Sequence, residues 1–347
     1  MKGKKIWQVA AGDRNRNYSE LCLRMGVILN GPGYAGPWPE CVKKLKQDGR
    51  SKKKLSDIKR FSLDIKDGDI VVLREGTDTV IGVGEVKGDY TWNDCFGDVD
   101  GWNLQHVRRV NWYELDSELP KKFPTYTLKQ GDTTQTLTSE LVIEWIESLG
   151  CSFDRSIQYP SILDAAQNDV EFEDVSNFLF DCGVSSNSID VLSKEIDELI
   201  RIARWYKDND NPSEFETVAY LAVPLLRALG WTPQKMAIEW NNVDIALFDN
   251  LPRSAKNLSV VVEAKKKGKS CLSAFSQAES YALGKNKCKR LIVTDGLRYG
   301  VYIKNNDKFN LHAYFNITRM KDSYSIFNCA GIKEGLRAMT PEWRSEE

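Results

Sequence analysis

Six polar side chains between residues 214 and 281 interrupt elements that are otherwise apolar. They are Glu214, Asp244, Glu263, Lys265, Gln277 and Tyr281. Asp244 lies in the run VDIALF and Glu263 in the run SVVVEAK, and both runs have the Val, Ile and Leu content of short β-strands. A carboxylate buried in such a strand is costly unless it is paired, protonated or bound to a metal. These carboxylates therefore indicate a metal site.

Strand geometry predicts how these groups meet. Side chains alternate between the two faces of a strand, so Glu263 and Lys265 point the same way. Asp244, on the preceding strand of an expected hairpin, lies opposite Glu263. With the Ala264 carbonyl, the two carboxylates form an oxygen site suited to Mg²⁺, with Mn²⁺ as a substitute. Such an ion polarises a scissile phosphate and lowers the pKa of an attacking water.

The other four polar groups fit supporting roles around this pair. Lys265 is expected to orient the water and to offset charge in the transition state. Glu214, at a helix start after Ser213, can reach the water shell of the metal, and Glu216 is the alternative for that role. Gln277 and Tyr281 are four residues apart on an expected helix, so they share one face, toward the active site or the DNA backbone.

At these residues the chain resembles the PD-(D/E)xK nuclease superfamily, and most of all the nuclease domain of type I restriction subunits. The resemblance covers about residues 211–305 and includes, in order, SEFETVAYLAVPLLRALGW, VDIALF, VVEAKK, QAESY and LIVTDGLRYGVYI. It implies a Mg²⁺-dependent deoxyribonuclease, a restriction endonuclease that hydrolyses phosphodiester bonds. The alternative is that the six residues are unrelated turn residues and surface ion pairs, each needing its own explanation. A nuclease site explains all of them together.

Two further features bear on how such a nuclease meets DNA. Lys266, Lys267 and Lys269 follow the strand that carries Glu263, where they form either a solvated face or contacts to the DNA backbone. No GxxxxGK[ST] phosphate loop occurs in the sequence. We therefore expect no ATP requirement, unless a separate motor subunit is recruited.

The first 115 residues have a different character, with expected strands broken by Gly and Asp turns and an unusual number of tryptophans. Aromatic rings in loops are costly unless they pack or bind, and they can stack on a flipped base while an Asp accepts from a cytosine amino group. The candidate base-binding residues are Trp38, Tyr90, Trp92, Asp94 and Trp102. Core packing is the alternative for each ring.

This module resembles the PUA-like group that includes the EVE, YTH and SRA domains. The resemblance covers residues 4–114 and is carried by KKIWQVAAGD, IKDGDIVVLREG, VIGVGEVKGDYTW and DGWNLQHVRRVNWYE. It implies a small β-barrel that holds a flipped, modified base, and we expect a modified cytosine. The basic run at 41–60, including Lys52, Lys53 and Lys54, is either a flexible solvated loop or a track for DNA phosphates.

Composition and charge indicate how the chain is divided into domains. With 347 residues, 41% of them hydrophobic, it fits a multidomain α+β and α/β protein. We expect a PUA-like domain at 1–115, a linker and acidic helical region at 116–210, and a nuclease domain with a mixed central sheet at 211–347. Residues 131–200 carry 2 basic against 15 acidic groups, so DNA should avoid them.

The same composition excludes several other classes. Eight cysteines without a CxxC pair and only two histidines argue against a zinc site, a disulfide framework and most histidine-dependent hydrolases. No apolar run suits a membrane span or a secretory signal, so we expect a cytoplasmic protein without membrane partners.

The leading hypothesis is a modification-dependent restriction endonuclease for phage defence, acting on double-stranded DNA as a homodimer, since one site cuts one strand. The alternatives are a nuclease subunit that acts with a separate ATPase and a non-catalytic nucleic-acid-binding protein.

Overall fold

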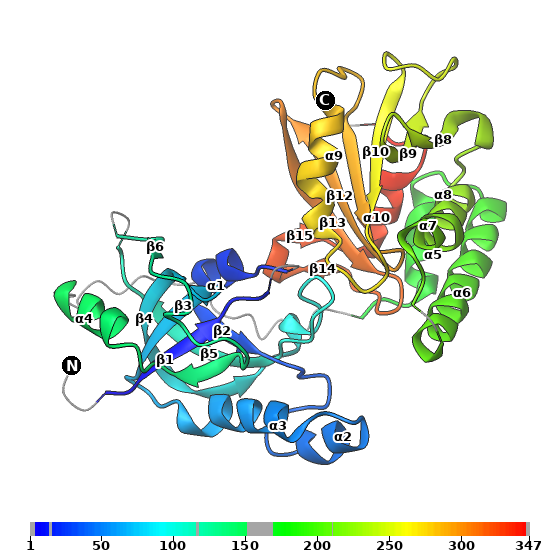
Figure 1. Ribbon diagram of the computed structural model, residues 1–347. Coiled ribbons are helices and arrows are strands. Elements are labelled where there is room, and N and C mark those ends of the chain that lie inside the picture. The colour runs from blue at the N-terminus through cyan, green and yellow to red at the C-terminus, as the bar shows by residue number, and fades with distance from the viewer. Residues whose placement is uncertain (1–3, 14–15, 116–117, 151–168, 210, 345–347) are drawn as a thin grey trace. The chain divides into compact units, whose positions relative to one another are not determined.

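The computed structural model describes residues 4–13, 16–115, 118–150, 169–209 and 211–344. The chain divides into two compact units, residues 1–166 and residues 167–347, and each is described here by itself (Figure 1). Both units combine helices with a mixed sheet, which agrees with the predicted multidomain α+β class.

Unit 1 is built on a seven-stranded sheet with the order β2-β5-β4-β3-β1-β7, in which β6 pairs with the start of β4. Only β1 and β3 are parallel; the other pairs are antiparallel. The strands are β1 (Ile6–Ala10), β2 (Val27–Asn30), β3 (Ile70–Glu75), β4 (Thr79–Trp92), β5 (His106–Trp112), β6 (Lys121–Lys122) and β7 (Thr134–Thr136). Apolar residues of β3 and β4 fill the core, as their Val and Ile content predicts.

The sheet of unit 1 is not the closed barrel that the sequence predicts. In the described part of the unit, its edge strands β2 and β7 do not pair through their backbones. Their side chains do meet, because the Asn30 amide donates to the Thr134 hydroxyl at 3.2 Å. Closure needs backbone pairing along the whole seam, and β7 is three residues long, so the sheet remains open.

The helices of unit 1 are α1 (Ser19–Met25), α2 (Cys41–Gln47), α3 (Lys52–Lys59), which runs into a π-helical turn (Arg60–Asp64), and α4 (Glu140–Ser148). A 3₁₀ turn spans Asp94–Phe96. The basic run at 41–60 is therefore helical and not a loop. Its apolar residues are buried at helical spacing, Cys41 with Leu45 and Leu55 with Ile58.

Unit 2 is built on an eight-stranded sheet with the order β14-β15-β13-β12-β11-β10-β9-β8. The pairs β10–β11 and β13–β15 are parallel, and the rest are antiparallel. The strands are β8 (Met236–Trp240), β9 (Val243–Phe248), β10 (Leu258–Ala264), β11 (Arg290–Thr294), β12 (Arg298–Asn305), β13 (Lys308–Asn316), β14 (Ser323–Tyr324) and β15 (Cys329–Ala330).

Helices cover both faces of this sheet (Figure 1). One face packs against α9, and the other packs against α5, α6, α8 and α10. The helices are α5 (Phe172–Asp181), α6 (Ser186–Asp208), α7 (Glu214–Thr217), a π-helical stretch (Val218–Ala222), α8 (Val223–Ala228), α9 (Phe275–Ala282) and α10 (Ile332–Met339). Three 3₁₀ turns (Pro233–Lys235, Leu272–Ala274 and Ser325–Phe327) complete the unit.

The middle of the chain is divided between the two units. Val142 and Ile146 of α4 join the core of unit 1, whereas Leu192 and Leu199 of α6 join the core of unit 2. The acidic helices α5 and α6 thus form part of the unit that carries Asp244 and Glu263. The region predicted as one segment at 116–210 is structurally two.

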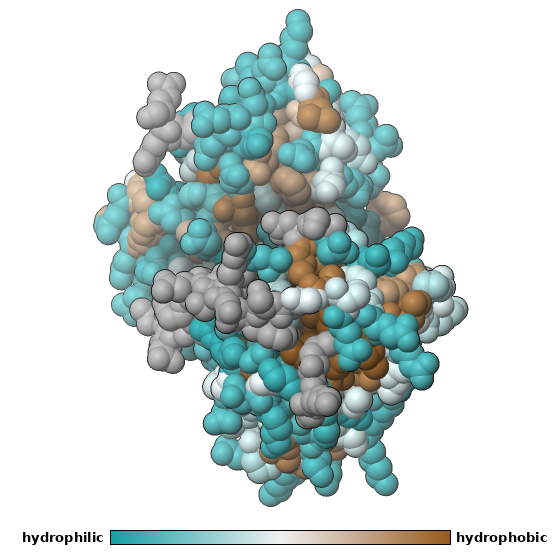
Figure 2. All heavy atoms as spheres, turned by 90° about the vertical axis from the view of Figure 1, so that its left-hand side faces the viewer, coloured by the Kyte–Doolittle hydropathy of each residue, from teal (hydrophilic) through white to brown (hydrophobic). Residues whose placement is uncertain are grey.

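Figure 2 shows hydrophilic side chains over most of one face, with smaller apolar areas between them. Within the described ranges, no helix combines the length and the apolar character needed to span a membrane.

Candidate active site

The centre of the candidate site is a pair of carboxylates on neighbouring strands. The register of β9 and β10 pairs Ile245 with Val262, which brings Asp244 beside Glu263. The backbone N–H of Asp244 donates to Glu263 Oε1 at 3.4 Å, and the Ala264 N–H donates to Asp244 Oδ2 at 2.7 Å. The structure therefore brings together the three residues from which the sequence predicts a metal site.

Glu263 is in an environment that disfavours a lone negative charge. Its side chain is fully buried, and burial together with the Asp244 carboxylate raises the pKa of Glu263 to about 8. Its Oε2 atom is buried without a hydrogen-bond partner in the described structure. A buried carboxylate oxygen of this kind calls for a proton or a cation.

The donor set fits a hard divalent cation. Two carboxylates and the Ala264 carbonyl supply only oxygen atoms, as Mg²⁺ prefers, and leave room in its coordination shell for water and phosphate. Among the described residues, no group of three or more His, Cys, Asp or Glu side chains is able to hold a metal. This pair is smaller than such a group, in keeping with the few protein ligands that Mg²⁺ commonly takes.

Lys265 is held on the side of α9. Its Nζ donates to Gln277 Oε1 at 3.0 Å, and the Gln277 amide donates to the Tyr281 hydroxyl at 3.4 Å. The pair at i and i+4 on α9 thus shares a face, as predicted, and that face contacts Lys265. The hydrogen bonds orient the ammonium group of Lys265 beyond the end of β10.

The two glutamates at the start of α7 differ in their hydrogen bonds and exposure. Glu216 is in a capping box with Ser213: its carboxylate accepts the Ser213 N–H at 2.7 Å, and its own N–H donates to the Ser213 hydroxyl at 3.2 Å. These hydrogen bonds, and then the charge of Lys266, hold the pKa of Glu216 below its ordinary value. Glu214 is exposed at the first position of α7, so it is the better placed of the two to reach a ligand.

Two residues near this site were not predicted. The Thr217 hydroxyl accepts the backbone N–H of Lys267, and the buried Asp295 accepts that of Gly268. Both hold the segment that follows β10. The Asp-Gly turn at 295–296 is a visible signal for Asp295, whereas no sequence signal distinguishes Thr217 from other small helix residues.

In unit 1, hydrogen bonds of three predicted aromatic residues involve the loop at 31–40. The backbone N–H of Trp38 donates to the Tyr90 hydroxyl at 3.1 Å, and that hydroxyl lies 2.7 Å from His106 Nδ1. The Trp92 indole N–H donates to the Gly33 carbonyl at 2.8 Å. The Pro-rich loop at 31–40 is thereby fixed to the ends of β4 and β5, with Trp38 and Trp92 half-buried.

The other two predicted base-binding residues are engaged elsewhere. Trp102 packs edge-on against Tyr18, with ring centroids 5.7 Å apart, and beneath the Arg16 guanidinium at 5.3 Å. Asp94 starts the 3₁₀ turn that follows Trp92. The described ring contacts of Trp102 are thus with Tyr18 and Arg16, whereas Trp38 and Tyr90 bond to each other and Tyr90 to His106.

The lysines at the start of α3 differ in exposure and in their ion pairs. Lys52 and Lys53 are exposed, and Lys53 lies 3.5 Å from the Asp132 carboxylate. Lys54 instead turns inward, where its ammonium donates to Asp57 at 2.9 Å and to Asn30 at 3.0 Å. Lys54 is therefore a structural cation rather than a surface charge for phosphates.

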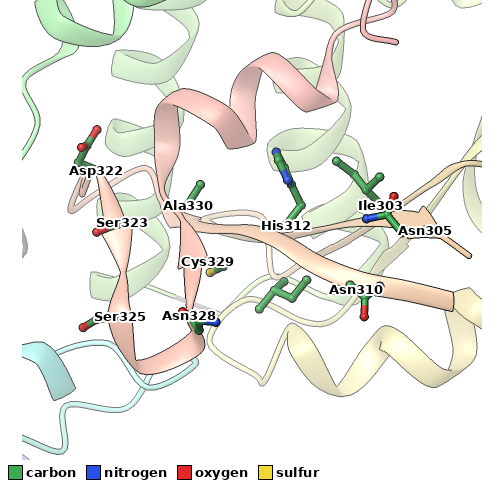
Figure 3. Close-up of a pocket in the computed structure, with 11 residues that line it drawn as sticks. Ile303, Asn305, Asn310, His312, Asp322, Ser323, Ser325, Asn328, Cys329 and Ala330 are labelled. Atoms are coloured by element: carbon green, nitrogen blue, oxygen red, sulfur yellow. The ribbon is translucent and has the colours of Figure 1, made fainter. Parts of the chain in front are cut away.

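A separate pocket of about 650 Å³ lies in unit 2 between β13 and the β14–β15 pair. Figure 3 shows His312 directed toward α10, whereas Asn310 lies on the other side of the strand. The His312 ring is 3.8 Å from Glu334. Because its polar groups do not converge, this pocket is a weaker site candidate than the carboxylate pair.

One known protein family matches part of the chain. A model described as a domain of unknown function (DUF8426) matches residues 7–139, within unit 1. No curated protein matches the chain.

Proposed function

We propose that the protein is a modification-dependent DNA endonuclease, in which a PD-(D/E)xK nuclease fold in unit 2 cuts and a PUA-like fold in unit 1 selects the target. The observation that carries the nuclease half is the Asp244–Glu263 pair with its unpartnered, buried Oε2 atom. The lysine two residues further on, held by Gln277, supplies the positive charge that phosphodiester hydrolysis needs.

In this proposal, Asp244, Glu263 and the Ala264 carbonyl hold Mg²⁺. A Mg²⁺ ion held by these residues would supply Lewis-acid chemistry at the scissile phosphate and would lower the pKa of a water molecule beside it. Lys265 orients the attacking water and offsets negative charge on the phosphoryl oxygens as the bond to the leaving oxygen breaks. Glu214 hydrogen-bonds water at the edge of the site, and the leaving 3′ oxygen takes a proton from solvent.

Support for the selecting half comes from the fixed aromatic loop of unit 1. Trp38 and Trp92 are half-buried, and hydrogen bonds hold the loop, an arrangement suited to stacking on a flipped base. A modified cytosine in double-stranded DNA is the proposed target. Because one site cuts one strand, a double-strand break requires two copies, and we propose a homodimer.

The test is cleavage by the full-length protein of duplexes that differ only in cytosine modification, with and without Mg²⁺. The expected result is Mg²⁺-dependent cutting of modified DNA alone. Equal cutting of all duplexes would remove the selecting role of unit 1, and no cutting of any duplex would remove the nuclease. Cutting that appears only with an added ATPase and ATP would favour the two-subunit alternative.

A further inference from the structure

A tight turn follows the strand that carries Glu263. Lys269 N–H donates to the Lys266 carbonyl at 2.9 Å, and Gly268, the third residue of this turn, has φ of +82°. A positive φ at this position favours glycine and is typical of a type II turn. The first and last residues of such a turn lie within about 7 Å of each other at Cα. Lys266 and Lys269, both exposed, therefore project from neighbouring points.

The backbone of this turn is fixed by three separate elements of unit 2. The Lys265 N–H donates to the Thr294 carbonyl of β11 at 2.7 Å. The Lys267 N–H donates to the Thr217 hydroxyl of α7 at 3.2 Å, and the Gly268 N–H donates to Asp295 Oδ2 at 3.1 Å. Three of the four amides from Lys265 to Gly268 are thus held by a strand, a helix and a loop.

Thr217 connects the turn to the start of α7. Its hydroxyl donates to the Ser213 carbonyl at 3.0 Å while accepting from Lys267, so one buried oxygen links the two segments. Ser213 is the N-cap of the helix that begins with Glu214. The position of the lysine turn is therefore tied to the position of Glu214.

Asp295 anchors the other side and is itself firmly held. It accepts the N–H groups of Leu297 and Arg298 at 3.1 and 2.7 Å, and its Oδ2 pairs with the Arg298 guanidinium at 2.9 Å. A carboxylate with so many donors is fixed in one orientation. Its bond to Gly268 is thus an anchor for the turn and not a mobile contact.

We propose that residues 265–269 form a phosphate-binding turn for the DNA strand, and that Thr217 is its positioning residue. This inference rests on the proposed nuclease function and names the partner of the turn, the phosphodiester backbone beside the cut. Lys266 and Lys269 contact the phosphates, and the Thr217 hydroxyl sets where those ammonium groups lie relative to Asp244 and Glu263.

The experiment compares Thr217→Val, which keeps the shape and removes the hydroxyl, with Thr217→Ser, which keeps the hydroxyl. Duplex binding by the full-length protein is measured without Mg²⁺ as a function of salt. We expect Thr217→Val to weaken binding about 5-fold and to lower the salt slope by about 1, because fewer phosphates are neutralised. Thr217→Ser should restore both, with the melting temperature of each variant close to that of the parent.

A double variant, Lys266→Ala with Lys269→Ala, completes the test. Thr217→Val should add little to its binding loss, since both changes remove the same contacts. Unchanged binding and slope in Thr217→Val, or a loss that adds fully to that of the lysine variant, would overturn the proposal. A melting defect that Thr217→Ser does not rescue would also overturn it. Absence of cleavage by the parent protein is a separate outcome that bears on the nuclease proposal alone.

Discussion

The Ala264 N–H donates to Asp244 Oδ2 at 2.7 Å across the β9–β10 pair. This hydrogen bond fixes the orientation of a half-buried carboxylate beside the fully buried Glu263. Two acidic groups are thus held together by the sheet itself, before any ligand arrives. Electrostatic repulsion between them is the cost of that arrangement, and a cation relieves it.

Glu263→Gln should separate stability from metal binding. Because burial and Asp244 disfavour the charge of Glu263, the neutral amide removes an unfavourable interaction from the metal-free protein. We expect the melting temperature at pH 8 to rise by roughly 2–5 °C. We also expect the stabilisation by Mg²⁺ and the cleavage to be lost.

Thermal melting with and without 10 mM Mg²⁺ measures both effects. Asp295→Asn is the matched control, since it replaces a buried carboxylate that donors already satisfy, and it should lower the melting temperature. A Glu263→Gln protein that still gains stability from Mg²⁺ would contradict the metal site.

Lys265→Met should slow cleavage by at least about 100-fold, the scale on which single electrostatic groups act in transition states. Duplex affinity should change by less than about 3-fold, because the ammonium serves the reacting phosphate. Gln277→Leu, which removes the acceptor of Lys265, should cost about 10-fold. Single-turnover rates measure both, and full additivity in the double variant would show that Gln277 does not act through Lys265.

The pH dependence of unit 1 should report on His106. Burial lowers the pKa of His106 from the ordinary histidine value of 6.5 to about 4. The unfolded chain therefore binds more protons between these values, so the contribution to stability is present above about pH 6.5 and is lost as pH falls toward 4. Its size is on the order of 3 kcal/mol at most.

Urea unfolding at pH 7 and pH 4.5 measures this contribution against His106→Gln, which cannot titrate. We expect the parent protein to lose more stability on acidification than the variant does. Parallel pH profiles would show that His106 is not held neutral in the folded state.

Lys54 and Lys53 should behave in opposite ways. Lys54→Met leaves the buried Asp57 carboxylate without its cation and should cost about 2 kcal/mol of folding stability. Lys53→Ala should leave stability unchanged and weaken DNA binding slightly at low salt. Chemical unfolding and salt-dependent binding distinguish the two, and a stable Lys54→Met protein would contradict the structural role of Lys54.

Fragment boundaries offer a test of the division of the chain. A fragment of residues 211–347 lacks α5 and α6, so Val218 and Leu225 lose the apolar cover of Leu192 and Leu199. We expect it to aggregate or to unfold non-cooperatively, whereas residues 167–347 should give one cooperative transition. Comparable melting of the two fragments would show that the acidic helices are dispensable.

Local patterns predicted the centre of unit 2 well. The runs at 243–248 and 258–264 are short, apolar and close in sequence, so their hairpin pairing and the meeting of Asp244 with Glu263 follow from strand alternation. The same holds for Gln277 and Tyr281, whose shared face depends only on helical spacing.

Other features depended on contacts that the local sequence does not contain. The lysines at 43–59 concealed the i and i+4 spacing of Cys41 and Leu45, so α2 and α3 were not predicted. Closure of the sheet in unit 1 depends on a seam between β2 and β7, about one hundred residues apart. The core that an amphipathic helix such as α4 joins is likewise decided by tertiary packing, which the local sequence does not reveal.

The interior position of β10 has a consequence for how the protein handles its ligands. β10 lies between β9 and β11, and Glu263 pairs with Val293 of β11, so its amide hydrogen should exchange slowly, on the scale of large openings of the unit. In the proposed function, a metal ion would therefore enter and leave without opening of the sheet at β10. If the proposed function holds, the metal site needs no rearrangement of the sheet, and the arrival of DNA would set the moment of reaction.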